Sequence, residues 1–263
     1  MSSHRLSLFI ASIALLALAL GAAFNSPLQA ADRISMPDSY EPQDLIAEDW
    51  QPLGVDAWTR TALNGHQQFL ATTERGMIAL RPVIHERMSY AVELYLRHGD
   101  KGFLKVMEHH QATLRKIDAL EAKHGSGPGL MSREAAGTSK AAAPPPQCSI
   151  DVLVDTGHVG CYNVAYAEGE YIADQAPCLG NCELWTFAFA GRTSCTTGVE
   201  TYDYDITEIT YSAPGGGGHY SNAFHLTTDN ESCNNFAEAE WNCSAGGFLY
   251  DYTTGSDCGC WAC

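Results

Sequence analysis

The sequence predicts an α+β protein, in which a small N-terminal helical bundle is joined by a flexible linker to a disulfide-rich antiparallel β-sandwich or jelly-roll-like domain. Three observations favour this fold class. Apolar residues recur at helical spacing before the linker, and polar and apolar residues alternate after it. All ten cysteines lie after the linker. We therefore expect the two halves to be stabilised in different ways.

Residues 1–31 have the pattern of a signal peptide. A short start carrying Arg5 precedes an apolar run from Leu6 to Phe24, and the segment closes on small residues at Ala30-Ala31. A run of ~20 apolar residues can span a bilayer, but the small residues that follow favour cleavage over a permanent anchor. We therefore expect a secreted, periplasmic or extracellular protein that has no membrane contact after cleavage.

Residues 32–124 are expected to be mainly helical, as a pro-region or an accessory domain. Apolar residues recur loosely at helical spacing from Trp58 to Leu80, and a proline follows this run. Further helices are predicted over Ile84–His98 and Lys101–His124, each followed by a glycine that can end a helix. The proline-containing stretch Asp32–Val55 is expected to be irregular.

Residues 125–147 form the predicted linker. The segment is rich in Gly, Ala, Ser and Pro, has no apolar period, and ends in Pro144–Pro146. A segment of this composition buries too little apolar surface to fold, and Arg133 and Lys140 would be accessible to a protease. Removal of the N-terminal region is therefore one of the alternatives that the sequence leaves open.

Residues 148–263 form the predicted cysteine-rich, acidic β domain. In Glu183–Ala190, bulky aromatic residues alternate with smaller ones, which predicts a central strand covered on both faces. Short antiparallel strands separated by turn residues are typical of sandwiches and jelly rolls. The predicted strands are 150–155, 162–171, 183–190, 201–206, 219–227, 236–243 and 248–252.

Charge excludes two classes of partner for the β domain. It contains Arg192 as its single basic residue against 16 acidic residues, within a chain of formal net charge −16. Such a surface repels the phosphates of nucleic acids and of anionic membranes. The expected partner is therefore an extracellular ligand of unknown identity, and the oligomeric state stays open.

The cysteines are expected to form structural disulfides, because an exported chain meets oxidants. The C-terminal "SDCGCWAC" also has spacings used by zinc sites, which Cys178 and Cys182 could complete, and by redox motifs. Both alternatives need reduced thiols, so disulfides are preferred. The predicted disulfide cysteines are Cys148, Cys161, Cys178, Cys182, Cys195, Cys233, Cys243, Cys258, Cys260 and Cys263.

Candidate catalytic groups are scattered. A serine triad could be assembled from Ser221, His158 or His225, and Asp155 or Asp229, but the chain has no nucleophile-elbow motif. Acids two residues apart share one face of a strand at about 7 Å, and carboxylate pairs perform glycoside hydrolysis. The pairs are Glu168 and Glu170, Asp203 and Asp205, and Glu238 and Glu240.

No cofactor is predicted, and calcium is the alternative that the sequence leaves open. Carboxylates suit this hard cation, and the candidate ligands are Asp203, Asp205, Asp229 and Glu231. Their spacing is not that of a twelve-residue calcium loop. In the helical half, the spacing of Glu108-His109-His110 predicts no metal site.

These observations favour an exported, disulfide-stabilised β-domain protein. Its expected role is that of an extracellular binding or interaction module with an N-terminal helical pro- or accessory region. A secreted hydrolase, using glycosidase-like carboxylates or Ser/His/Asp chemistry, and a toxin-like effector are the alternatives. Whether the protein is an enzyme is left open by the sequence.

Overall fold

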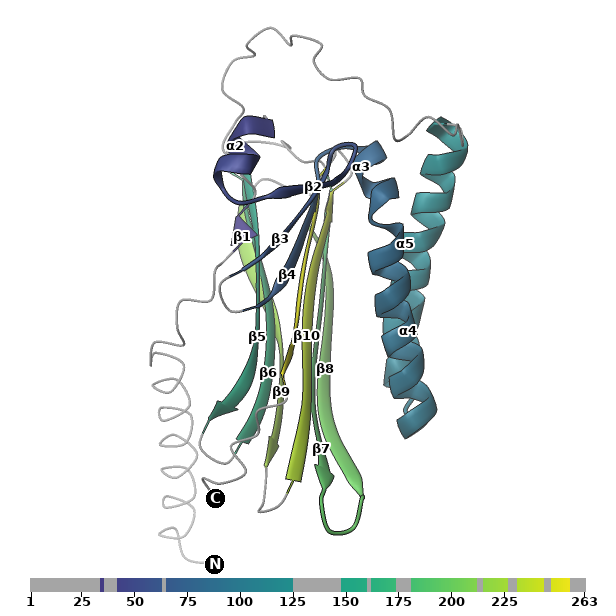
Figure 1. Cartoon of the computed structure of the whole chain (residues 1–263), viewed down its shortest axis with the longest axis vertical. Coiled ribbons are helices and arrows are strands. Elements are labelled where there is room, and N and C mark those ends of the chain that lie inside the picture. The colour runs from purple at the N-terminus through teal and green to yellow at the C-terminus, as the bar shows by residue number, and fades with distance from the viewer. Residues whose placement is uncertain are drawn as a thin grey trace, which may run out of the picture.

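The computed structural model describes the parts of the chain that form a three-layered core (Figure 1). A helical layer covers one face of a large sheet, and a small sheet covers the other face. The predicted signal peptide and linker lie outside the described residues. The described ranges are 34–35, 42–62, 65–124, 148–159, 162–173, 181–211, 215–226, 231–243 and 247–255.

The large sheet joins the two halves of the chain. Within the described ranges it has seven antiparallel strands, in the order β2 (Gln51–Gly54), β3 (Ala57–Thr61), β4 (Gln67–Ala71), β11 (Phe248–Gly255), β10 (Glu231–Cys243), β7 (Cys182–Ser194) and β8 (Glu200–Tyr211). Strand β4 pairs directly with β11, so that Leu70 lies opposite Leu249. The large sheet therefore contains strands from both sides of the predicted linker.

The small sheet belongs almost entirely to the second half of the chain. Its described strands follow the order β1 (Ile34–Ser35), β5 (Cys148–Val159), β6 (Tyr162–Ala173) and β9 (Gly215–Leu226). Each strand predicted after the linker overlaps one of β5 to β11. The α+β class and the antiparallel sheets are thus confirmed.

Small side chains fill the space between the two sheets. The buried residues there include Ala165, Ala167, Ala188, Ala190, Ala223, Ala237 and Ala239. On β6, a Cβ atom added to Gly169 would lie 2.2 Å from Leu184 Cδ1 of β7. The sheets therefore approach each other closely at this point, and a glycine permits it.

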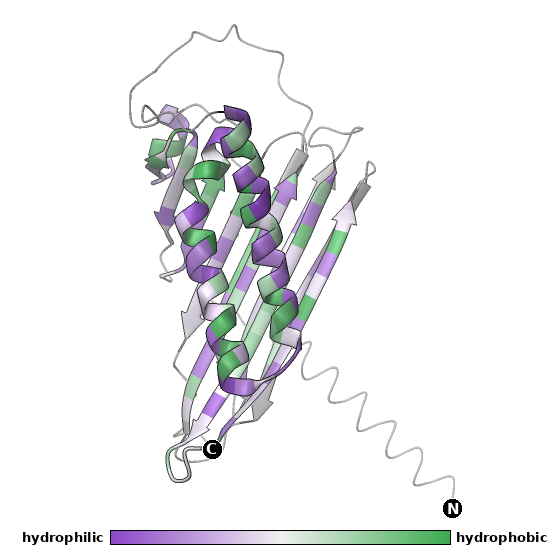
Figure 2. Cartoon of the chain, turned by 90° about the vertical axis from the view of Figure 1, so that its right-hand side faces the viewer, coloured by the Kyte–Doolittle hydropathy of each residue, from purple (hydrophilic) through white to green (hydrophobic). Residues whose placement is uncertain are grey.

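The helical layer consists mainly of a hairpin formed by α4 (Arg81–His98) and α5 (Gly102–His124), preceded by the short α3 (Glu74–Ala79). Figure 2 shows α4 and α5 lying across the strands of the large sheet. Both long helices are confirmed, and α4 ends as predicted at Gly99, whose φ is 68°. Within the described residues, no helix has the length and hydropathy needed to cross a bilayer.

The helix predicted over Trp58–Leu80 is wrong for most of its length. Residues 57–61 and 67–71 form β3 and β4, and only α3 is helical. Phe69 packs toward the helices and Leu70 toward the small sheet, which is the alternation of a strand buried on both faces. Pairing with β11 overrides the local helical spacing. The stretch expected to be irregular likewise contains α2 (Pro42–Ala47) and β2.

The helices do not form an independent bundle, because they bury their apolar faces on the large sheet. Phe103 of α5 packs against Phe187 and Phe189 of β7 at ring-centroid distances of 6.4 and 5.9 Å. At the start of α5, Asp100 accepts hydrogen bonds from the hydroxyls of Tyr202 and Tyr204, each at 3.1 Å. Strand β7 is buried on both faces, as predicted.

Among the described residues, two of the cysteines predicted to form disulfides are joined in one. Cys182 and Cys243 lie opposite each other on β7 and β10, with a Cα–Cα distance of 4.1 Å. Cys182 is therefore not a zinc ligand, because its sulfur is bonded to another sulfur. Cys195 carries a free thiol, exposed in the turn between β7 and β8, and Cys233 is buried on β10.

The pairing of the other cysteines stays a prediction. The structure describes the backbone of Cys148 on β5 but not its side chain. Five further cysteines lie outside the described residues: Cys161, Cys178, Cys258, Cys260 and Cys263.

Candidate functional site

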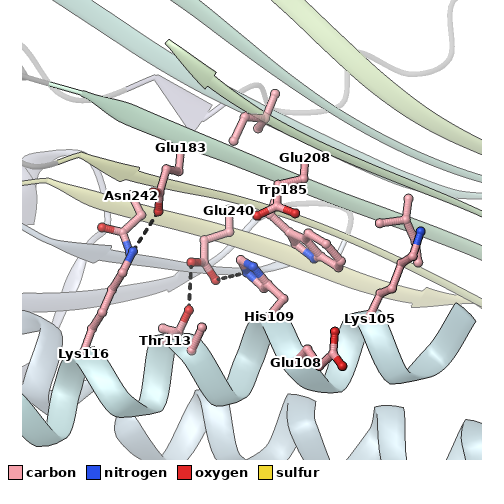
Figure 3. A pocket seen from close by; sticks show the side chains of 13 residues that line it. Lys105, Glu108, His109, Thr113, Lys116, Glu183, Trp185, Glu208, Glu240 and Asn242 are labelled. Atoms are coloured by element: carbon pink, nitrogen blue, oxygen red, sulfur yellow. Dashed lines mark hydrogen bonds and ion pairs between the residues drawn. The ribbon is translucent and has the colours of Figure 1, made fainter. Parts of the chain in front are cut away.

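A cavity of about 640 Å³ lies between α5 and the strands β7, β8 and β10 of the large sheet (Figure 3). Its volume is in the range of small-molecule sites. Among its lining residues are His109, Thr113, Lys116, Trp185, Glu208 and Glu240. The cavity is thus built jointly by the N-terminal helical region and the C-terminal strands.

Regular local structure brings these side chains together. On α5, His109 and Thr113 are four residues apart and share one helix face. In the large sheet, Glu240 of β10 lies opposite Trp185 of β7, which lies opposite Glu208 of β8. The row of strand residues therefore faces the row of helix residues across the cavity.

His109 is held between an aromatic ring and a carboxylate. Its ring stacks on Trp185 with a centroid distance of 4.2 Å and an interplanar angle of 5°. Its Nε2 lies 3.2 Å from Oε2 of Glu240, but at an angle that does not suit a hydrogen bond. Both atoms are buried and have no hydrogen-bond partner among the described residues. This contact therefore leaves two buried polar atoms unsatisfied.

His110 and Glu238 form a buried ion pair next to this contact. His110 Nε2 lies 3.1 Å from Glu238 Oε1, and the Tyr250 hydroxyl donates to Glu238 Oε2 at 2.6 Å. Burial opposes charge on both groups, but the carboxylates of Glu238 and Glu240 raise the pKa of His110. Burial is the largest single influence on Glu238 and raises its pKa, but the charge of His110 together with the hydrogen bonds from His110 and Tyr250 lowers the pKa overall. Each group therefore favours the charged form of the other.

Glu240 is oriented by a second contact from α5. The Thr113 hydroxyl donates to its Oε1 at 3.4 Å, so that Oε2 remains directed at His109 (Figure 3). One nitrogen or oxygen atom from each of His109, His110 and Glu240 lies within 4.8 Å of the others. These three residues could hold a metal ion.

The sequence spacing alone does not reveal this cluster. Two adjacent histidines on a helix do not match a known metal-binding spacing, and the glutamate lies 130 residues further along the chain. The sequence feature that could have indicated this cluster is the pair of acids Glu238 and Glu240, which share one strand face. Of these two acids, Glu240 lines the cavity, and Glu238 is buried beside it against His110.

The part of the chain that the structure describes shows no calcium site formed by the candidate ligands. Asp203 is exposed on β8, and Asp205 accepts backbone N–H bonds from Ile206 and Asn222 at 2.9 and 3.2 Å. Asp229 and the side chain of Glu231 lie outside the description. Calcium binding stays a prediction.

The serine triad is not assembled in the described part of the chain. Ser221 is buried between the sheets, with its hydroxyl 2.7 Å from that of Thr186. His158 is exposed, and burial raises the pKa of Asp155, although the backbone of Thr156 donates to it. The side chains of His225 and Asp229 are not described. A buried Ser221 hydroxyl cannot reach a substrate.

The remaining carboxylate pair lies away from the cavity. Glu168 and Glu170 are half-buried on β6 of the small sheet, and the Tyr166 hydroxyl donates to Glu168 at 2.7 Å. This arrangement is typical of a solvated sheet face.

No protein-family model matches the chain, and no curated protein matches its sequence. We therefore infer the function from the geometry of the cavity.

Proposed function

We propose that this protein is an exported binding module that takes a small, positively charged ligand into the cavity between α5 and the large sheet. Export is supported by the signal-peptide pattern of residues 1–31 and by the disulfide between Cys182 and Cys243. Since α5 forms one wall of the cavity, the helical region acts as an accessory part of the binding site.

The charge of the cavity carries the proposal. Its lining includes more carboxylates than ammonium groups, and one of the lysines, Lys116, is already paired with Glu183 at 2.7 Å. A cavity with an excess of negative charge concentrates cations. The charged lining residues are Lys105, Lys116, Glu108, Glu183, Glu208 and Glu240.

The hydrolase alternative has less support from this site. A glycosidase needs a carboxylic acid whose pKa is raised, so that it can donate a proton. The pKa of Glu238 is lowered instead: burial favours its neutral form most strongly of any single cause, but the charge of His110 and the hydrogen bonds from His110 and Tyr250 together outweigh burial. Both of its oxygens are also engaged, by His110 and Tyr250.

Calorimetric titration tests this proposal. The ligands are straight-chain diamines of several lengths, and dicarboxylates of the same lengths are the matched controls. We expect diamines to bind and dicarboxylates not to bind. Glu208→Gln should weaken diamine binding about tenfold, the equivalent of losing one charge-assisted contact.

Glu48→Gln, at an exposed position outside the cavity lining, is the control variant and should bind as the unmodified protein does. The proposal fails if no diamine binds, or if Glu208→Gln and Glu48→Gln have equal affinities.

A further inference from the structure

We infer that His109, His110 and Glu240 form a binding site for a divalent transition-metal ion such as Zn²⁺ at the wall of this cavity. The inference rests on the proposed function, because it identifies the class of cation that the cavity binds. It follows from three observations: the set of donor atoms, their unsatisfied state, and the contacts that hold them in place.

The donor atoms suit zinc. Imidazole nitrogen and carboxylate oxygen are its common ligands, at bond lengths of about 2.0–2.2 Å. Around a tetrahedral ion, such bonds place neighbouring donor atoms about 3.3 Å apart. The separation of His109 Nε2 and Glu240 Oε2 is 3.2 Å, and His110 contributes a third donor atom within 4.8 Å of both. A set with two nitrogens favours zinc over calcium or magnesium, which prefer oxygen ligands.

Each of the three residues has a buried polar atom that lacks a hydrogen-bond partner among the described residues. These atoms are His109 Nε2, His110 Nδ1 and Glu240 Oε2. Buried polar groups in native proteins are nearly always satisfied, so a cluster of unsatisfied atoms needs an explanation. A bound cation would satisfy one lone pair on each of these atoms.

The neighbouring contacts hold the ligands as a metal site requires. A metal-binding histidine commonly donates its other ring N–H to a carboxylate, which fixes its tautomer and orientation. Glu238 provides this carboxylate to His110 at 3.1 Å. Trp185 holds the His109 ring by stacking, and Thr113 holds Glu240 by a hydrogen bond.

Three protein ligands leave a coordination position for water or for a further ligand. Because His109 and Glu240 line the cavity of about 640 Å³, that position is reached from the cavity.

Titration of the chelator-treated protein with Zn²⁺ tests the inference. We expect one ion to bind per chain with a Kd below about 10 μM, and Co²⁺ to bind at the same site with a visible absorption spectrum. His109→Ala and Glu240→Gln should each weaken Zn²⁺ binding by at least about 100-fold, because each removes a direct ligand.

Two variants serve as matched controls. His124→Ala removes a histidine of the same helix that contacts Glu74 instead of the cavity. Cys195→Ser removes the exposed thiol, which could bind zinc independently. Both should bind zinc as the unmodified protein does. The inference is overturned if zinc fails to bind, or if the His109→Ala and Glu240→Gln variants bind it as tightly as these controls.

Nitrogen-15 spectra of the histidine rings provide a measurement that needs no substitution. With one equivalent of zinc, the signals of two imidazoles should shift; a protein that binds zinc with no such shift would contradict the site.

Titration of the zinc-free protein with diamines separates the two proposals. Diamine binding without zinc binding would reject the metal site and retain the cation-binding function. Binding of neither would reject both.

Discussion

The two faces of the large sheet are built from alternate residues of the same strands, yet they differ in size and chemistry. Toward the small sheet, the middle parts of β7 and β10 present alanines, including Ala188 and Ala237, although Leu184 and Trp241 lie on the same faces. Toward the helices, the same strands present Phe187, Phe189 and Phe236. Small residues allow two sheets to pack closely, whereas bulky rings fill the wider space under a pair of cylindrical helices. Where the helical face is not filled by aromatic rings, it contains the cavity.

Buried carboxyl groups show the same contrast. Glu238, on the helical face of β10, is buried, which raises its pKa, but the charge of His110 and the hydrogen bonds from His110 and Tyr250 together lower the pKa overall. Asp251, on the sheet-facing side of β11, has a pKa raised well above its usual value by burial. Around Asp251 are the amide of Gln68 at 3.5 Å, His66 at 4.0 Å and the charge of Arg60, which lowers the pKa less than burial raises it. The surroundings of Glu238 on the helical face thus favour its charged form, whereas the surroundings of Asp251 on the sheet-facing side favour its neutral form.

Of the changes that test the difference between the two faces, removal of the helical layer should reduce stability the most. A chain consisting of residues 148–263 would expose the aromatic face of β7 and β10 and lose the pairing of β4 with β11. We expect it to aggregate or to remain unfolded. By contrast, the full chain cut within residues 125–147 should elute in size-exclusion chromatography as one complex.

The two products also decide the role of the N-terminal region. A stable, monomeric 148–263 chain with native circular dichroism would contradict the structural role and would favour a removable pro-region.

Substitution of two neighbouring residues compares the faces directly. Phe187→Ala creates a cavity under the helices and should lower the free energy of unfolding by about 3–5 kcal/mol. Ala188→Leu overfills the space between the sheets and should lower it by about 1–3 kcal/mol. Both side chains are fully buried. Urea unfolding of the two variants gives both values, and a larger loss for Ala188→Leu would contradict the proposed difference in packing.

The pH dependence of the free energy of unfolding should reveal the raised pKa of Asp251 on the sheet-facing side. The pKa of Asp251 is higher in the folded protein than in the unfolded chain. Its stabilising contribution is therefore complete below the unfolded pKa of about 3.9 and is lost as pH rises through the folded pKa. Above pH 4, this group should lower the free energy of unfolding by up to about 1.4 kcal/mol per pH unit.

Asp251→Asn has nearly the same shape and does not titrate. We expect the difference in unfolding free energy between the protein and this variant to change as pH rises above about 4. Parallel curves over this range would show that Asp251 is already ionised in the folded protein.

Much of the fold can be predicted from local pattern. Alternating residues define strands such as β7, and helical spacing with a terminal glycine defines α4 and α5. Residues 57–71 could not be predicted in this way, because short apolar runs suit either a helix or a strand. Their pairing with β11, nearly 180 residues away, decides between the two.

The site shows the same limit. That Glu238 and Glu240 share a strand face follows from the sequence, and so does the presence of two adjacent histidines on a helix. That these groups meet, buried and within a few ångströms, depends on how α5 lies on β10.

The sequence by itself determined the export pattern, the acidity of the second half and most strands and helices, because these depend on composition and on neighbours along the chain. The tertiary structure decided that the N-terminal region completes the large sheet and that a cavity with His109 and Glu240 exists. Those features depend on contacts between residues far apart in sequence, which form only when the burial of large apolar surfaces outweighs the entropy of closing long loops.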